Sequence, residues 1–347
     1  MAEQILPDFY RIEIPLPGSP LKAINSYLIK GPERCLLIDT GMNREECLRA
    51  MLSGLKELDA DLERTDIFIT HMHADHLGLV GDLTTETSCV YLGEKEVDLF
   101  QRINEMRDEH FQNLFAYYLS NGFPEPELRV AVDNHPGLQF RPKLRTGFRG
   151  LKDGDRIEVG RYAFECIETP GHSPGHMCLY EAKEKILLSG DHILFDITPN
   201  ITRWPEFENP LKDYFQSLEK IYGLEVKLVL PGHRNSMNNH RIRITELKKH
   251  YRERLEEIMT VLGRGEKTAW DVASEITWNI AVDSWEHFPT VQKWFAIGET
   301  IAHLKYLEAE GRIRIREEDK KTTYRLLKGA QDDKRCEKED LVGEIGP

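Results

Sequence analysis

Short apolar runs that end in turns fill the first ninety residues of the chain. The segments I-E-I-P-L-P-G, I-N-S-Y-L-I-K-G and R-C-L-L-I-D-T-G each close with glycine, which is the pattern of short strands. Apolar residues at helical spacing follow near residues 44–58, and the strand-like run T-D-I-F-I-T comes next. This alternation of strand and helix predicts an α/β fold.

The middle of the chain combines an expected helical insertion with a second set of strands. Apolar residues three or four apart predict one long helix over residues 94–120, and an irregular, Pro-rich stretch continues to residue 146. Strand-like runs then return as D-G-D-R-I-E-V-G, Y-A-F-E-C-I-E-T-P, M-C-L-Y-E-A and K-I-L-L-S-G-D. A helix near residues 210–221 and a strand, V-K-L-V-L-P-G-H, complete this part.

The pattern changes after a helix expected near residues 241–262. A short helix at D-V-A-S-E-I-T and a longer one that ends at Gly311 precede a hairpin formed by R-I-R-I-R and Y-R-L-L. Helices followed by a two-stranded wing favour a winged-helix domain. We therefore expect an α/β domain over residues 1–240, a winged-helix domain with its linker helix over residues 241–328, and a charged, disordered tail over residues 329–347.

Composition and charge narrow the class of protein. The 347 residues are 40% apolar, which permits a large core. We find no apolar run of about 18 residues and no secretory leader, so we expect a cytoplasmic protein without a membrane span. Six cysteines without a C-x-x-C pair predict no disulfides. The net charge of −13 disfavours nucleic acid as a partner, because a negative field repels a polyanion.

A cluster of histidines supplies the candidate chemistry. The segment T-H-M-H-A-D-H-L-G follows the apolar run I-F-I and places His71, His73, Asp75 and His76 within six positions. Burying three imidazoles and a carboxylate without a cation would leave polar groups unsatisfied, so the pattern predicts metal binding. One metal ion does not accommodate four side chains from so short an arc, whereas two neighbouring ions do.

Further metal ligands are expected where other strands end. The motifs T-P-G-H-S-P-G-H, L-L-S-G-D-H-I and V-L-P-G-H follow apolar runs and offer His172, Asp191 and His233. All three lie beside glycine or proline, in loops where α/β folds usually place ligands. The sequence therefore predicts a site assembled from distant segments.

The order of these motifs resembles the metallo-β-lactamase superfamily over about residues 10–240. The similarity runs from N-S-Y-L-I and L-L-I-D-T-G, through the histidine cluster, to N-P-L-K-D-Y-F-Q-S-L and L-P-G-H. The resemblance implies a four-layer αββα sandwich with a dinuclear site in the groove between its sheets. It also implies two ligand sets with Asp191 bridging them, namely His71, His73 and His172 for one metal and Asp75, His76 and His233 for the other.

The resemblance also assigns supporting roles around the site. Asp39 matches an aspartate that orients ligand histidines in the family. His176 and His192 lie beside ligand positions, and we expect them to support the ligands rather than to bind metal. Arg234 stands where many members have glycine after the last motif. Its guanidinium either holds an anionic group of the substrate or points outward to a surface carboxylate.

Metal-assisted hydrolysis is the reaction class expected of such a site. Two cations that share a water lower its pKa, so a metal-bridging hydroxide becomes available as nucleophile, and Asp75 is expected to orient it. Histidine and carboxylate ligands favour zinc, and they also suit iron and manganese.

The C-terminal helices and the helix over residues 94–120 help to distinguish between classes of substrate. The segment W-F-A-I-G-E-T-I-A-H-L-K-Y-L-E-A-E-G resembles the winged-helix domain of a superfamily branch that includes glyoxalase II-like thioesterases, other esterases and an endoribonuclease. Two lysines against three glutamates between residues 290 and 311 disfavour DNA binding. This domain is expected to pack beside the groove or at a homodimer interface. The apolar face of the helix over residues 94–120 either packs on the core or on a second subunit, or it roofs the metal groove and lines a pocket for the substrate.

These observations favour a hydrolase of a small acyl substrate, a carboxylic thioester or ester. A lactonase would differ only in the shape of the pocket, and an endoribonuclease or phosphodiesterase would use the same metals, so both stay open as alternatives. A redox diiron protein is disfavoured because the cluster lacks a glutamate ligand and the chain lacks a flavin-binding segment. A β-lactamase is disfavoured because such enzymes are exported.

Overall fold

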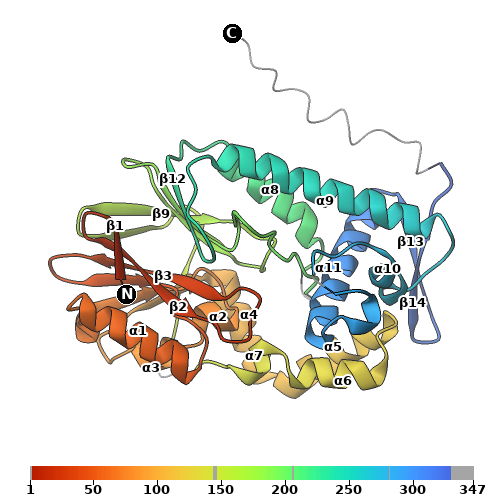
Figure 1. Ribbon diagram of the computed structural model, residues 1–347, viewed down its shortest axis with the longest axis horizontal. Coiled ribbons are helices and arrows are strands. Elements are labelled where there is room, and N and C mark those ends of the chain that lie inside the picture. Colours follow the sequence, from red (N-terminus) through yellow and green to blue (C-terminus); the bar gives the residue numbers. More distant parts are fainter. Residues whose placement is uncertain (1, 144–146, 205–206, 281, 330–347) are drawn as a thin grey trace, which may run out of the picture.

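Two mixed β-sheets packed face to face, with helices on their outer faces, form one half of the molecule, on the left in Figure 1. The structure is a computed structural model that describes residues 2–143, 147–204, 207–280 and 282–329. The first sheet follows the chain order. Its strands are antiparallel from β1 to β4 and parallel from β4 to β7. Their bounds are β1 Ala2–Leu6, β2 Phe9–Pro15, β3 Ala23–Lys30, β4 Cys35–Ile38, β5 Thr65–Phe68, β6 Val90–Gly93 and β7 Arg149–Leu151.

The second sheet has the order β12-β11-β10-β9-β8. Its strands pair antiparallel except for β11 and β12, which are parallel. The carboxyl ends of β11 and β12 therefore meet at one edge of the sheet. The bounds are β8 Arg156–Val159, β9 Tyr162–Glu168, β10 Met177–Glu181, β11 Ile186–Gly190 and β12 Leu228–Pro231.

Alternating side chains build the core between the two sheets. Along β9 the side chains of Tyr162, Phe164 and Cys166 are buried, whereas the intervening residues are exposed. They pack against apolar side chains of the first sheet, among them Phe68 and Ile38. Period-two burial of this kind is what a strand with one face in the core produces. The predicted α/β sandwich is thus confirmed.

Helices cover both outer faces of the sandwich. On the first sheet, α1 buries Cys47, Met51 and Leu55, which are four residues apart and share one face of the helix. The outer face of the second sheet is covered by α8 and α9, which form a cluster that includes Leu187 and Val229 of the sheet. The helices of the sandwich are α1 Glu45–Glu57, α2 Ala74–Leu77, α3 Val80–Leu83, α4 Glu94–Glu105, α8 Pro210–Tyr222 and α9 His240–Leu262.

The insertion between β6 and β7 differs from the single helix expected over residues 94–120. It contains four helices, because the chain leaves helical geometry at Met106, with φ −109° and ψ 33°, and because prolines start two more helices. Pro126 and Pro136 each stand in a first turn, where a missing N–H costs nothing. The helices after α4 are α5 Arg107–Ser120, α6 Glu125–Asp133 and α7 Pro136–Gln139.

The C-terminal part is joined to the sandwich by α9, which runs from one to the other (Figure 1). It contains α10 Ala269–Glu275, α11 Thr290–Ala309 and the hairpin of β13 Ile313–Glu318 and β14 Lys321–Leu326. Tyr118 of α5 stacks on Trp294 of α11, with ring centroids 3.9 Å apart. The apolar face of α5 thus packs on the C-terminal core, as one of the two sequence interpretations expected.

The cysteines and the helices can be compared with the predictions of no disulfides and no membrane span. The five cysteines within the described residues, Cys35, Cys47, Cys89, Cys166 and Cys178, are free thiols, as predicted. Cys336 and the tail predicted to be disordered from residue 330 onward lie outside the described residues. No helix among the described residues combines the length and apolar character needed to cross a membrane.

Candidate metal centre

All seven predicted ligands lie where strands end, and the fold brings them together at one edge of the two sheets. His71 and His73 follow β5, and Asp75 and His76 belong to the short helix α2. The other three follow or connect strands of the second sheet. His172 lies in the β9–β10 loop, Asp191 directly after β11, and His233 two residues after β12.

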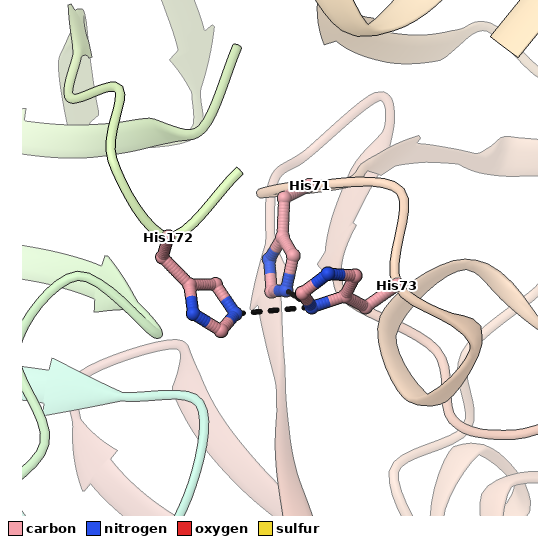
Figure 2. Close-up of side chains that lie close together, drawn as sticks. All are labelled: His71, His73 and His172. Atoms are coloured by element: carbon pink, nitrogen blue, oxygen red, sulfur yellow. Dashed lines mark hydrogen bonds between the residues drawn. The ribbon is translucent and has the colours of Figure 1, made fainter. Parts of the chain in front are cut away.

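Three imidazoles form one group of candidate ligands (Figure 2). The Nε2 atom of His71 lies 2.9 Å from Nδ1 of His73, and Nε2 of His172 lies 3.0 Å from the same Nδ1. Figure 2 shows the three rings turned toward one another, with His172 arriving from a different segment than the other two. These atoms satisfy the distances of a possible metal site.

The second group contains Asp75, His76 and His233, whose ligand atoms also lie close enough to hold one ion. The Nε2 atom of His233 is 3.3 Å from Oδ2 of Asp75. Asp191 stands between the two groups. Its oxygens lie 3.5 Å from Nε2 of His76, 3.4 Å from Nε2 of His233 and 3.7 Å from Nε2 of His172. This is the position that a shared carboxylate requires.

Backbone carbonyls fix two of the rings from outside. Nδ1 of His172 donates to the carbonyl of Asn200 at 2.8 Å, and Nδ1 of His233 donates to the carbonyl of Ala23 at 2.7 Å. A carbonyl only accepts, so each ring carries its proton on Nδ1. With Nδ1 fixed as the donor, Nε2 is the ring atom that faces the site, which is the arrangement of metal-binding histidines.

Asp39 holds the first ligand loop from behind. Its carboxylate accepts the backbone N–H of Thr70 at 2.8 Å and Nδ1–H of His76 at 2.8 Å. The Thr70 hydroxyl lies 2.9 Å from the same carboxylate and 3.0 Å from Nδ1 of His71. Because β4 and β5 are parallel neighbours, their ends place Asp39 beside this loop. Asp39 thus contacts a candidate ligand, and its orienting role stays a prediction.

His176 and His192 occupy different surroundings. Nδ1 of His176 bonds the Thr169 hydroxyl at 2.8 Å, and its Nε2 accepts the backbone N–H of Asp191 at 3.2 Å. The ring thereby contacts the loop that carries Asp191, and its supporting role stays a prediction. The ring of His192 packs against Tyr214, with centroids 5.2 Å apart, and makes no hydrogen bond to a predicted ligand. Its supporting contact is packing alone.

Arg234 adopts a left-handed backbone conformation, with φ 65°. Its Nη2 donates to the carbonyl of Pro20 at 2.7 Å, and its own carbonyl accepts Nδ2–H of Asn25 at 2.9 Å. The side chain is thus tied to a backbone loop rather than to a surface carboxylate. Its role toward an anionic substrate stays a prediction.

Charges in the cluster perturb one another strongly. Burial alone would lower the pKa of His76, but the carboxylates of Asp39 and Asp191 raise it well above its usual range. Burial opposes charge on His233 as well, yet neighbouring carboxylates, Asp191 first, raise its pKa to about 10. By contrast, burial and a neighbouring imidazole lower the pKa of His73 to about 3. Such mutual dependence is typical of functional sites.

The donor set fits divalent cations. Nε2 of His76, Nε2 of His233 and Oδ1 of Asp191 are buried and have no hydrogen-bond partner. Buried polar atoms are normally paired, so unpaired atoms that converge on one point indicate a missing partner that accepts lone pairs. Imidazole nitrogens and carboxylate oxygens suit zinc, iron and manganese.

Glycines next to the ligands leave room for them. A Cβ at Gly232 would lie 2.5 Å from Oδ1 of Asp191 and 2.8 Å from Cε1 of His76. A Cβ at Gly190, where φ is 47°, would lie 2.6 Å from Nε2 of His176. The glycines of the motifs S-G-D-H and P-G-H are therefore required by close packing around the shared carboxylate.

Glu96 of α4 is a part of the site that the sequence did not indicate. Its side chain is fully buried, and its two oxygens accept the backbone N–H groups of Met72 and Gly175, each at 2.8 Å. Met72 lies between two ligand histidines, and Gly175 lies three residues after His172. Burial raises the pKa of this carboxyl group. One side chain thus ties together two ligand loops.

Trp204 is a second residue that the sequence did not indicate. Its ring lies 6.1 Å from the ring of His73, and the two planes are nearly parallel at 19°. The segment that precedes it, N-I-T-R over residues 200–203, is an irregular loop without periodicity. Position in such a loop depends on tertiary contacts, so no pattern in the sequence indicates it.

Comparisons with known proteins agree with this geometry. The family model of the metallo-beta-lactamase superfamily matches residues 20–233, and a model of the metallo-beta-lactamase-like C-terminal domain matches residues 255–328. The chain is 26% identical to a probable metallo-hydrolase, YqjP, of Bacillus subtilis over 92% of this chain and 98% of that protein. It is 28% identical to the human acyl-coenzyme A thioesterase MBLAC2 over 63% of this chain and 75% of the relative.

A solved structure extends the similarity to nearly the whole chain. The crystal structure of a metallo-beta-lactamase family protein from Thermus thermophilus superposes with a TM-score of 0.78 at 29% sequence identity. It covers 93% of this chain and all of the other. The family model covers more than half of the chain, and the relatives and the solved structure agree with it. The chain therefore belongs to the metallo-beta-lactamase superfamily.

Proposed function

We propose that this protein is a dinuclear, zinc-dependent hydrolase of small acyl thioesters. As a member of its superfamily it is a metallo-hydrolase. The observation that carries the dinuclear proposal is the place of Asp191, whose two oxygens face both groups of candidate ligands. Oδ1 lies near His76, and Oδ2 lies near both His233 and His172, so the carboxylate is within reach of an ion in either group.

The residues of the chain have defined tasks in this proposal. When bound, a pair of divalent cations would lower the pKa of water toward neutrality and polarise a carbonyl oxygen. Asp75 is held ionised, because His233 lowers its pKa below the usual range although burial opposes this. Its carboxylate accepts a hydrogen bond from the attacking water and orients it. The carbonyls of Asn200 and Ala23 keep two ligand rings in the productive tautomer.

A thioester is the substrate class that the observations support best. A human relative carries the name acyl-coenzyme A thioesterase. The net charge of −13 opposes the approach of RNA. Hydrolysis of a thioester needs only a carbonyl beside the metal pair and space for its acyl group.

The C-terminal part supports the same choice. We propose domains over residues 1–240 and 241–328, the second a winged helix without a role in nucleic-acid binding. The two lysines of α11 are already paired, since Lys293 bonds Glu127 at 2.6 Å and Lys305 bonds Glu308 at 3.1 Å. Lysines neutralised in this way are poor ligands for phosphate.

A substrate panel tests the proposal. Purified wild-type protein, His71→Ala and the exposed-site control His287→Ala are assayed on short acyl-CoA thioesters, lactones and RNA. We expect thioester hydrolysis by the wild type and by His287→Ala, and a loss of at least about 100-fold in His71→Ala. Cleavage of RNA or of lactones that depends on His71, without thioester hydrolysis, would overturn the substrate class.

A further inference from the structure

The segment over residues 199–204 lies between α11 and the proposed metal ligands. On the side of the metal site, the carbonyl of Asn200 accepts the Nδ1 proton of His172 at 2.8 Å. Four residues later, the ring of Trp204 lies against that of His73 at 6.1 Å. One short loop thus contacts two of the three imidazoles in the first ligand group.

On its other side this loop is bonded to α11. Nδ2 of Asn200 donates to Oε2 of Glu299 at 2.8 Å and lies 3.5 Å from the carbonyl of Phe295. The backbone N–H of Arg203 donates to the carbonyl of Gly298 at 3.1 Å. These contacts along one helix face fix both the side chain and the backbone of the loop.

Close packing leaves the loop little freedom. A Cβ at Gly298 would lie 2.0 Å from the hydroxyl oxygen of Thr202, so α11 approaches the loop as closely as a glycine permits. From α9, the hydroxyl of Tyr251 donates to the carbonyl of Pro199. The Glu299 side chain is buried, with 8% of its surface exposed. A buried carboxylate that lost Asn200 would lose its polar partner on this loop.

We propose that α11 is a working part of the metal centre and that Glu299 is a positioning residue, which sets the ring of His172 through Asn200. This inference rests on the proposed metal site. The C-terminal part would then influence metal affinity. The carbonyl of Asn200 fixes the tautomer of His172, and α11 holds the loop that contains Asn200. Partners of ligand histidines influence metal affinity by about 10- to 100-fold.

Paired substitutions of Glu299 and Asn200 test this role. Zinc affinity is measured by competition with a chromophoric chelator, and the cobalt-substituted proteins are compared by visible absorption. We expect Glu299→Leu and Asn200→Ala each to weaken zinc binding about 10-fold or more and to change the cobalt bands. Glu299→Gln keeps an acceptor oxygen and should retain wild-type affinity. The double variant Glu299→Leu/Asn200→Ala should bind zinc no more weakly than Asn200→Ala.

Leu304→Ala is the control for general destabilisation of α11. Leu304 is buried in the apolar core on another face of the same helix. Its variant should lose stability and keep its zinc affinity and cobalt spectrum. Unchanged affinity in both Glu299→Leu and Asn200→Ala, or an equal loss in Leu304→Ala, would overturn the inference. A wild-type protein that binds no zinc or cobalt would instead overturn the metal site itself.

Discussion

The candidate ligands could be predicted from the sequence, whereas most of the groups that hold them in place could not. Seven ligands were predicted by residue number, because only histidine, cysteine and carboxylates bind such metals and because four of them crowd into one short segment. Of their outer partners, Asp39 was expected from the resemblance, whereas the backbone acceptors were not. The acceptors of His172 and His233 are backbone carbonyls of Asn200 and Ala23, which any residue type provides. Candidate ligands can be identified from their side-chain type, whereas their backbone partners can be identified only from the folded structure.

Glu96→Gln should weaken metal binding without unfolding the protein. The carboxylate of Glu96 accepts the backbone N–H groups of Met72 and Gly175. A glutamine has only one acceptor oxygen, so one of these two hydrogen bonds is lost. We expect zinc affinity to fall about 10-fold, measured by chelator competition. The matched control is Glu181→Gln, since Glu181 is also buried and accepts a backbone N–H, at the far end of β10. Equal affinities in both variants would contradict the role of Glu96.

Gly232→Ala should disrupt the site by contact alone. The added methyl group would lie 2.5 Å from Oδ1 of Asp191, so the carboxylate must move. Shifts of this kind cost about 1–3 kcal/mol, and we expect metal affinity and turnover to fall accordingly. Gly223→Ala is the control, because its nearest neighbouring atom, the carbonyl oxygen of Lys220, would be 3.6 Å away. Full activity of Gly232→Ala would show that the carboxylate is not fixed there.

At the scale of elements, strands and capped helices followed from the sequence, and the insertion did not. The helices α1, α8, α9 and α11 lie within a few residues of their expected ranges, because long apolar periodicity dominates them. No glycine or proline lies near Met106, so the sequence did not predict the end of the helix there. Helices α6 and α7 have a proline in the first turn, and a Pro-rich stretch also predicts irregular structure. The short strands β1, β6 and β7 lack a strong alternation and were not predicted.

Glu299 should make the stability of the protein depend on pH. Burial raises its pKa to about 7, against the opposing charge of Arg254 and the hydrogen bond from Asn200. The unfolded glutamate loses its proton near pH 4.3, whereas the folded one keeps it until about pH 7. The free energy of unfolding should therefore fall as pH rises between these values, by up to roughly 3 kcal/mol.

The measurement for this prediction is urea unfolding of metal-free protein between pH 4.5 and 8. Glu299→Gln resembles the protonated side chain and lacks the titration. The difference between the two proteins should be small at the acidic end and should grow toward pH 8, where the wild type is the less stable. Parallel stability curves would show that the folded carboxyl group does not titrate in this range.

At the scale of the whole molecule, the sandwich and the C-terminal part share one apolar cluster. It extends from Leu187 and Val229 of the second sheet, through Leu218 of α8, to Ile297 and Ile301 of α11. A sequence boundary at residue 240 coincides with the start of α9, but the packing continues across it. Contacts between segments so distant in sequence depend on the complete fold. The sequence pattern therefore indicated a sandwich and a C-terminal part but not the apolar core that they share.

Removal of metal should lower the thermal stability of the entire protein. Ions that bind only the folded state stabilise it by mass action. Treatment with a strong chelator should therefore reduce the melting temperature of the wild type by roughly 5 °C or more. His71→Ala should show a much smaller response. Identical melting temperatures with and without chelator would argue that the histidine cluster holds no ion.

The central claim is that Asp191 serves two cations at once. Metal content per chain, determined by elemental analysis of wild-type protein and of Asp191→Asn after dialysis, tests it most directly. We predict two divalent ions per wild-type chain and fewer than one per variant chain, because the shared carboxylate contributes to both groups. Two ions retained by the folded variant, or at most one in the wild type, would contradict the account.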